Sequence, residues 1–409
     1  MNSANLSSFL RLGYFLDYPQ APIRIDISGV RKAEYCQATE EELIREGQRR
    51  LTAAVAARFR SGREHCVPLS GGWDSRVILG ELLKHTDAAR IHTFTFGIPG
   101  AWDFELGNAV AAAVGTDHTR FDLTKHTYTR QELLDVSRRS EHQTMLFLHP
   151  PLAEVDRRFG HCHLWSGFLG DPLAGSHLPK QPGKTLGQAK RHFLAKNTMT
   201  RLPELCDCDP EALGELVAFD APGHPDVTLE EQLDFRNRQA KFIAPHVLLD
   251  GLQFETPFLD PLLINFWLGV PDPLRRGQVL YQKIALRACG ELFRVGTTGS
   301  YGLPPDRGRW TYWPRRIAAR LRRALSQRYT WLVDPMTNYI EFSKAIRERA
   351  DVRELVGANV RALARRGIVD GIDSEQLWND HLGKRADNGY ALLALCSLEI
   401  HLQAGKELN

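Results

Sequence analysis

The sequence lacks a long hydrophobic run, a strong excess of one charge and any regular spacing of cysteine. None of its 409 residues belongs to an apolar stretch near the length of about 18 residues that a membrane helix needs, and no cationic segment precedes an apolar run at residues 1–11. We therefore expect neither a membrane-spanning nor a secreted protein. The formal charge of +3 is too small over this length to make nucleic acid the default partner.

The seven cysteines are odd in number and scattered along the chain. This usage is typical of thiols that stay reduced, so we predict a cytoplasmic location. Apolar residues make up 43% and charged residues 25% of the chain, which is ordinary for a folded globular protein. The length predicts two structural units.

Residues 1–38 contain Pro19, Pro22 and Gly29 and are expected to form an extended lead-in. A helix is then predicted to begin at Thr39, because Thr39 and Glu42 have the spacing of a capping box. Strands are predicted at 66–69, 91–96 and 163–166, with helices at 74–84 and 104–114 between them. Strands that alternate with helices predict an α/β fold with a parallel sheet, whose ligands bind at the carboxyl edge. From about residue 229 the pattern is helix after helix, which predicts a helical C-terminal lobe.

The strongest chemical signal is Ser70-Gly71-Gly72-Trp73-Asp74-Ser75, placed between a predicted strand and a predicted helix. Paired glycines let successive backbone N–H groups converge on an anion, and the helix N-terminus adds its positive end. The two serine hydroxyls can donate to phosphate oxygens, and Asp74 can hold Mg²⁺. The alternative is a plain strand-to-helix turn with a serine cap, which this motif in this context disfavours.

This motif is that of the PP-loop ATP pyrophosphatases, and further segments resemble the synthetase domain of class B asparagine synthetases. The similar segments are Thr93-Phe94-Thr95-Phe96-Gly97, Asp103, residues 109–115, His118, residues 165–171, residues 255–260, residues 283–287 and residues 301–304. Relatives with this domain include β-lactam synthetases and lasso-peptide macrocyclases. The resemblance implies a lead-in at 1–38, a synthetase domain at 39–295 and a helical lobe at 296–409.

The resemblance also implies a site that uses ATP and Mg²⁺. It places nucleotide-binding residues at Leu69, Ser70, Gly71, Gly72, Asp74, Ser75, Phe96, Gly97 and Gly167, metal ligands at Asp74 and Asp171, and catalytic residues at Asp74, Asp171 and Lys283. Two acidic side chains that hold Mg²⁺ over pyrophosphate would neutralise the charge that develops on this leaving group.

Three departures from the family pattern affect the expected chemistry. The chain enters the synthetase domain almost at once, without the glutaminase domain of these relatives, so glutamine hydrolysis is not expected. Phe168 stands where enzymes of the family place a Glu or Tyr near the attacking amine. The family lysine before a Gly-Phe turn is missing, and Arg287, Arg294 or Arg307 are the open candidates for its replacement.

We therefore expect an ATP-dependent synthetase that adenylates a carboxylate and transfers the acyl group to an amine. Its substrates would be small molecules or peptides, in specialised-metabolite or peptide maturation, and a partner protein is possible. The alternatives are a non-catalytic, synthetase-derived partner subunit and a PP-loop RNA-modifying enzyme. The near-neutral charge and the lack of paired cysteines speak against the last of these.

Weaker signals remain open. Arg236 and Arg238 either reach the nucleotide phosphates or lie on a solvated helix. We interpret His161-Cys162-His163 and Cys206-Asp207-Cys208 as structural, because neither has a partner at zinc spacing. The arginines of 315–328 accompany Ile317, Leu321 and Leu325, which predicts an amphipathic helix. That pattern suits a membrane surface or an acidic partner, but we favour a helix packed on its own lobe with its arginines in water.

Overall fold

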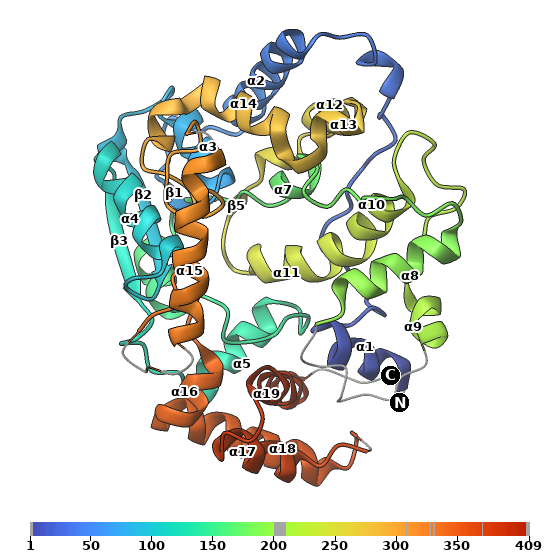
Figure 1. The fold of residues 1–409 in the computed structure, drawn as a ribbon, viewed down its shortest axis with the longest axis vertical. Coiled ribbons are helices and arrows are strands. Elements are labelled where there is room, and N and C mark those ends of the chain that lie inside the picture. Colours follow the sequence, from blue (N-terminus) through green and yellow to red (C-terminus); the bar gives the residue numbers. More distant parts are fainter. Residues whose placement is uncertain are drawn as a thin grey trace.

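The computed structural model describes residues 3–199, 210–307, 309–326, 329, 332–369 and 371–405, and its centre is a parallel sheet (Figure 1). The sheet has five strands in the order β3-β2-β1-β4-β5, and every neighbouring pair is parallel. The strands are β1 (His65–Pro68), β2 (Ile91–Gly97), β3 (Asp117–Asp122), β4 (His163–Trp165) and β5 (Phe254–Glu255). This order confirms the predicted α/β fold.

Helices surround the sheet and continue beyond it. The first half of the chain contains α1 (Ser3–Leu12), α2 (Glu40–Ala56), α3 (Asp74–Leu82), α4 (Trp102–Val114), α5 (Arg130–Arg139), α6 (Leu152–Phe159), α7 (Gly170–Leu173) and α8 (Leu186–Asn197). The middle contains α9 (Pro210–Leu216), α10 (Leu229–Leu233), the π-helix η4 (Asp234–Ile243), α11 (Ala244–Val247), α12 (Pro261–Gly269), α13 (Asp272–Arg275) and α14 (Val279–Cys289). The last part contains α15 (Tyr312–Ser326), α16 (Phe342–Glu348), α17 (Ala350–Arg366), α18 (Ser374–Leu382) and α19 (Gly389–Gln403). Short 3₁₀ helices are η1 (Lys32–Glu34), η2 (Ala88–Arg90), η5 (Pro257–Leu259), η6 (Arg276–Gln278), η7 (Gly290–Phe293) and η8 (Arg309–Thr311).

Helices cover both faces of the central strand β1. Val67 packs in the largest hydrophobic core together with residues of α2, α3, α4, α12 and α14. Cys66, the preceding residue, points to the other face and packs with α6. Because neighbouring side chains of a strand alternate between faces, burial on both faces requires helices on both sides of the sheet.

The helix after the lead-in begins as predicted. The hydroxyl of Thr39 accepts a hydrogen bond from the Glu42 N–H, and the Glu42 carboxylate accepts one from the Thr39 N–H. This reciprocal capping box satisfies two backbone donors that would otherwise lack a partner at the start of α2.

The expectation of an extended lead-in is wrong for its first part. Residues 3–12 form α1, and its Leu6, Phe9 and Leu10 are buried in a second core. That core also contains side chains of α5, α16, α17 and α19, so the start of the chain packs beside its helical C-terminal part (Figure 1). The signal was weak because α1 is short and has no acidic residue in its first turn.

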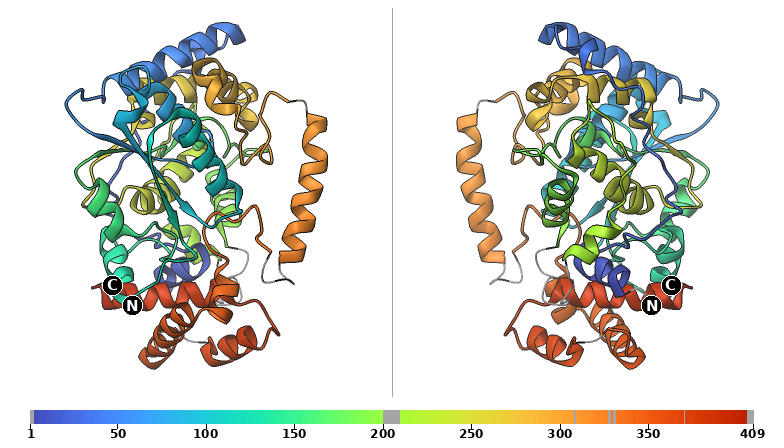
Figure 2. Two further views of the ribbon diagram at one scale, coloured as in Figure 1. Left: turned by 90° about the vertical axis from the view of Figure 1, so that its left-hand side faces the viewer. Right: turned by 90° about the vertical axis from the view of Figure 1, so that its right-hand side faces the viewer.

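The expectation that the Arg-rich helix packs its apolar face on the helical lobe is also wrong. α15 lies at the periphery, joined to the rest of the protein by connecting segments (Figure 2). Ile317, Leu321 and Leu325 are 49%, 59% and 46% exposed. Among the described residues, no helix combines the length and the apolar content needed to cross a bilayer.

Candidate functional site

The two glycine-rich strand ends meet at Asp74. Asp74 is the first residue of α3, directly after the β1 turn, while Gly167 and Gly170 follow β4. A β-carbon on Gly167 would lie 2.6 Å from Cβ of Asp74, and one on Gly170 would lie 2.6 Å from its carboxyl carbon. Only glycine lets the backbone after β4 come this close to Asp74. The glycines of residues 165–171 therefore allow Asp171 to lie near Asp74.

The Asp74 carboxylate lies in a partly buried, polar setting. The Tyr281 hydroxyl of α14 donates to its Oδ1 over 2.6 Å. Burial raises the pKa of Asp74 well above its usual range, and the neighbouring Asp171 carboxylate raises this pKa further. Hydrogen bonds from Tyr281 and from the Asp171 backbone oppose that rise. Two carboxyl groups this close favour a cation between them.

Asp171 is held by hydrogen bonds from Gln278, which precedes α14, and from Ser176. Its Oδ1 accepts a hydrogen bond of 2.7 Å from the Gln278 side chain, and its carbonyl accepts one of 2.7 Å from the Ser176 hydroxyl. Gln278 precedes α14, the helix that also supplies Tyr281. The start of α14 and the residue before it therefore contact both acidic residues.

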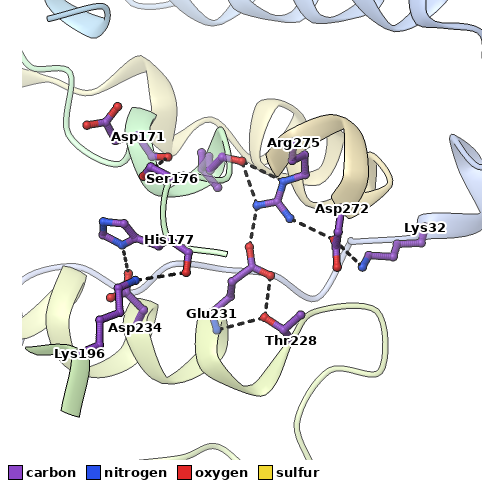
Figure 3. A network of polar contacts seen from close by, with 11 residues as sticks. Lys32, Asp171, Ser176, His177, Lys196, Thr228, Glu231, Asp234, Asp272 and Arg275 are labelled. Carbon is purple, nitrogen blue, oxygen red and sulfur yellow. Dashed lines mark hydrogen bonds and ion pairs between the residues drawn. The ribbon is translucent and has the colours of Figure 1, made fainter. Parts of the chain in front are cut away.

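A polar network anchors the segment that follows Asp171 (Figure 3). Arg275 and Glu231, which are 1% and 2% exposed, form an ion pair of 2.6 Å. The Arg275 guanidinium also donates to the Leu173 carbonyl, at 3.1 and 2.9 Å. Nearby, His177 pairs with Asp234 at 2.9 Å. Although burial opposes it, the hydrogen bond from His177 lowers the pKa of Asp234.

The turn between β1 and α3 is preorganised by internal hydrogen bonds. The Gly71 N–H donates to Oδ1 of Asp103 over 2.8 Å, and the Gly72 N–H donates to the Ser70 hydroxyl over 3.2 Å. The Ser70 and Ser75 hydroxyls lie 3.2 Å apart. The predicted anion-binding groups are therefore present, and in the ligand-free protein they hydrogen-bond to one another and to Asp103. An incoming phosphate would replace the side-chain oxygens that now accept from the Gly71 and Gly72 N–H groups.

A later segment, residues 292–303, closes over this turn. Buried Arg76 donates to the carbonyls of Gly296, at 2.5 Å, and Gly71, at 3.2 Å. The Thr298 N–H donates to the Gly71 carbonyl over 3.0 Å. A β-carbon on Gly71 would lie 2.5 Å from the Thr298 side chain, so this position also requires glycine.

Two adjoining cavities lie at the carboxyl edge of the sheet. A polar cleft of about 400 Å³ is lined by Ser70, Asp74, Ser75, Asp171 and Arg238, among others. We call it the acidic cleft. An apolar chamber of about 200 Å³ is lined by side chains that include Phe94, Phe96, Trp165, His149 and Tyr339. Pro68, Ser166, Gly167 and Val247 line both cavities, so they form a shared wall.

Among the residues singled out from the sequence, Phe96 and Phe168 line these cavities, whereas Leu69 and Gly97 do not. Leu69 is buried, and its carbonyl accepts a hydrogen bond from Thr95. Gly97 has a φ of 151°, and a β-carbon there would lie 3.2 Å from the Asn338 carbonyl. Phe96 stacks on Tyr339 with ring centroids 5.8 Å apart. Phe168 is 4% exposed and belongs to the main core, and it also lines the acidic cleft.

The structure does not bring Lys283 to the site. Its ammonium group pairs with Glu40 of α2 at 2.6 Å, and the Lys283 side chain is 43% exposed. Two residues along a helix correspond to a rotation of about 200°, so Lys283 points away from the side on which Tyr281 contacts Asp74. The structure therefore contradicts the prediction of Lys283 as a catalytic residue of this site.

The open candidates for a replacement cation are also elsewhere. Arg287 pairs with Glu41, Arg294 pairs with Glu291, and Arg307 is exposed; none of them lines the acidic cleft. Arg238 does line it. Arg236, two residues earlier, is 42% exposed and lies 3.7 Å from Asp220. The π-helix that carries both arginines is a rare conformation, often found at functional sites.

Sequence reasoning missed Tyr281, Gln278 and His177. Tyr281 and Gln278 contact the two acidic residues, and His177 lines the cleft. Gln278 and Tyr281 lie far along the chain from the motifs, whereas His177 follows Asp171 by six residues. No local spacing marks any of the three.

The oxygen-rich donor set fits Mg²⁺. Asp74 and Asp171 supply two carboxylates, and hydroxyls of Ser70 and Ser75 lie in the same cleft. Hard divalent cations prefer such oxygen ligands, whereas the cleft lining contains no cysteine.

The other proposed metal-ligand runs are separate from the cleft. His161 lies 2.8 Å from a carboxylate oxygen of Glu64, and His163 lies 3.0 Å from Glu255. Glu64, His161 and Cys162 form a small cluster near the amino-terminal end of β1. Residues 206–208 lie outside the described residues.

Comparison with known proteins agrees with this arrangement. Residues 46–182 match the asparagine synthase family. This part of the chain is asparagine synthetase-like. The matched region contains both Asp74 and Asp171, together with β1 to β4.

Two curated relatives match over shorter stretches. A putative glutamine-hydrolysing asparagine synthetase 2 of Methanocaldococcus jannaschii is 39% identical over 64 residues, which is 16% of this chain and 12% of the relative. A glutamine-hydrolysing asparagine synthetase 2 of Arabidopsis thaliana is 37% identical over 79 residues, which is 17% of this chain and 14% of the relative. The alignments thus span less than a fifth of the chain and of either relative.

Proposed function

We propose that the protein is an ATP-dependent carbon–nitrogen ligase that forms an amide from a carboxylate and an amine. The observation that carries this proposal is the meeting of Asp74 and Asp171 through Gly167 and Gly170 within the asparagine synthetase-like region. An anion-binding turn and two carboxylates at one sheet edge are suited to a nucleoside triphosphate with its metal.

The two cavities suggest how ATP lies. The apolar chamber, with Phe96 and Gly167, accepts the adenine, and the triphosphate crosses the shared wall towards Ser70 and Asp74. Asp74 and Asp171 would hold Mg²⁺, which would supply positive charge to neutralise the departing pyrophosphate. The acidic cleft leaves room for the carboxylate substrate beside the α-phosphate.

The proposed reaction has two balanced steps. A carboxylate oxygen bonds to the α-phosphorus while the bond from this phosphorus to the bridging oxygen of pyrophosphate breaks. The amine nitrogen then bonds to the acyl carbon, the carbon–oxygen bond to AMP breaks, and the amine releases a proton. Holding both substrates in one cleft makes each step effectively intramolecular.

Arg238 is proposed as the cation of the cleft. It lines the cavity, whereas Lys283, Arg287 and Arg294 pair with glutamates outside it. A guanidinium at this place can bind a carboxylate or phosphate through two parallel hydrogen bonds. In this assignment Arg238 takes the role for which the family uses a lysine.

We propose small molecules or peptides as substrates, in specialised-metabolite or peptide maturation. The cleft volume of about 400 Å³ is suited to a small carboxylate or a chain end. Identifying the substrate pair requires a panel of carboxylates, each tested with a panel of amines.

Product analysis tests the proposed function. The purified chain is incubated with ATP, Mg²⁺ and each substrate pair, and nucleotides and amides are separated. AMP, pyrophosphate and amide are expected in equal amounts, and Asp74→Asn should slow the formation of all three by about 100-fold. Asp135→Asn, on a half-exposed side chain of α5, is the matched control. ADP and phosphate as products would contradict the proposal.

A further inference from the structure

α15 presents an apolar stripe to solvent. Trp313, Ile317, Leu321 and Leu325 follow one another at intervals of four residues and are 46% to 59% exposed. Trp310, just before the helix, is 86% exposed. Ala319 is the buried residue of this helix, and it lies on the side opposite Ile317 and Leu321. The helix therefore rests on a small residue and points its large apolar side chains away from the protein.

The polar part of the same segment carries charge of one sign. Residues 307–333 contain eight arginines and no aspartate or glutamate. Arg316 and Arg320 are exposed, and helix geometry places them at one border of the apolar stripe. Arg322 donates to the Val333 carbonyl over 3.0 Å, and Arg323 lies 3.5 Å from Asp334, so the helix is also tied to its own chain.

Both flanks of α15 are attached to the candidate site. Before the helix, Thr298 is hydrogen-bonded to the Gly71 carbonyl. After it, the Pro335 carbonyl accepts from the Trp102 N–H at 2.8 Å, and Tyr339 stacks on Phe96. A surface that binds α15 would thus lie close to the edge of the sheet that carries the cleft.

We propose that α15 binds the surface of a membrane rich in anionic lipid. The exposed arginines of a segment that contains no aspartate or glutamate complement lipid phosphates, and tryptophan with leucine and isoleucine suits the boundary between headgroups and acyl chains. The apolar stripe of a single protruding helix is convex, so its partner must surround it. A bilayer interface can deform around such a helix, whereas a protein partner would need a preformed groove. The proposal is independent of the proposed ligase activity.

Vesicle binding tests it on the whole chain. Vesicles of phosphatidylcholine with phosphatidylglycerol are compared with vesicles of phosphatidylcholine alone by co-sedimentation at low and moderate salt. We expect binding to the anionic vesicles, a weakening with salt, and at least a tenfold loss for Ile317→Ser/Leu321→Ser. Leu262→Ser is the matched control, because Leu262 and Leu321 are each 59% exposed.

Tryptophan fluorescence gives a second reading. Trp310 and Trp313 should shift to shorter wavelength on anionic vesicles, and Trp310→Phe/Trp313→Phe should remove that shift while sedimentation persists. Equal binding to neutral vesicles, or unchanged binding of Ile317→Ser/Leu321→Ser, would overturn the proposal. Self-association that these two substitutions abolish, without any vesicle binding, would overturn it in favour of a second copy as the occupant.

Discussion

The carboxyl edge of the sheet holds the Asp74 carboxyl group in a partly buried setting, whereas α15 exposes hydrophobic side chains. At the first region Asp74 sits against Gly167 and Gly170, and burial holds its pKa well above the usual range. At the second region Leu321 is more than half exposed. Each region reverses the usual distribution of polar and apolar groups, and neither reversal stabilises the fold.

The two reversals differ in what supports them. At the carboxyl edge, other parts of the chain hold the acidic groups: Tyr281 and Gln278 contact the acidic pair, and the buried ion pair of Arg275 with Glu231 anchors the neighbouring segment. On α15, Arg322 and Arg323 contact the segment that follows the helix, whereas the apolar side chains point to solvent. The first region is thus preorganised for a ligand inside the protein, and the second presents a surface to a ligand outside it.

Removing one partner of the buried ion pair should have the largest effect on the fold. Arg275→Ala leaves Glu231 buried without its guanidinium, which should lower the free energy of unfolding by about 4 kcal/mol. Chemical denaturation measures this change. The double substitution Arg275→Met/Glu231→Leu should recover much of the loss, because it removes both charges. An unstable double variant together with a stable Arg275→Ala would contradict this account of the network.

Asp74→Asn should separate activity from stability. The expected loss in kcat/KM is about 100-fold, since one of two metal-binding carboxylates is removed. The raised pKa of Asp74 means that ionising this group in the folded, ligand-free protein is unfavourable. This penalty is absent below the ordinary aspartate pKa, grows as pH rises from there towards the raised pKa, and is constant above it. The ligand-free variant should therefore be more stable than the wild type at high pH, by about 1 kcal/mol, with no difference in acid. Thermal unfolding across pH measures this, and a variant that is less stable at high pH would contradict it.

Arg238→Ala should reduce kcat/KM by about tenfold, because a single cation in an open cleft loses a charge-assisted hydrogen bond. Arg236→Ala, on the same π-helix and exposed to solvent, is the control and should leave the rate unchanged. Steady-state kinetics distinguish the two variants. Equal losses would indicate an effect of the helix as a whole and would remove Arg238 from the site.

Leu321→Ser should have the smallest effect on the fold, within about 0.5 kcal/mol of the wild type. Leu263→Ala, at a fully buried position of α12, should cost about 3 kcal/mol. Denaturation of the two variants compares the same residue type outside and inside the protein. A large loss for Leu321→Ser would show that the stripe of α15 packs within the folded chain.

Much of the site was predictable because its signals are local. Ser70–Ser75 and residues 165–171 each combine a strand end, glycines and an acidic residue, and parallel strands bring such ends to one edge. β3 was missed because its sequence, Asp117–Asp122, is mostly polar and only Phe121 is buried. Tyr281 was missed because no local pattern relates α14 to the turn after β1.

The direction of α15 was not predictable from its sequence. A four-residue spacing of Ile317, Leu321 and Leu325 shows that the helix has one apolar side, but the same spacing arises whether this side faces the protein or solvent. The buried Ala319 settles the orientation, and burial of one alanine is a property of the tertiary structure. The same holds for Lys283: the sequence does not show which side of α14 packs against α3, so it does not show whether the Lys283 side chain points to the site.

Nucleotide binding tests the central claim most directly, because it requires no knowledge of the substrate pair. Calorimetric titration of ATP into the whole chain is performed with and without Mg²⁺, for the wild type, Asp74→Asn, Asp171→Asn and the control Asp135→Asn. We predict that wild type and control bind ATP tightly only with Mg²⁺, and that each of the two site variants loses most of this binding. Absence of ATP binding by the wild type, or binding that neither Asp74→Asn nor Asp171→Asn weakens, would contradict the assignment of the two strand ends as one nucleotide site.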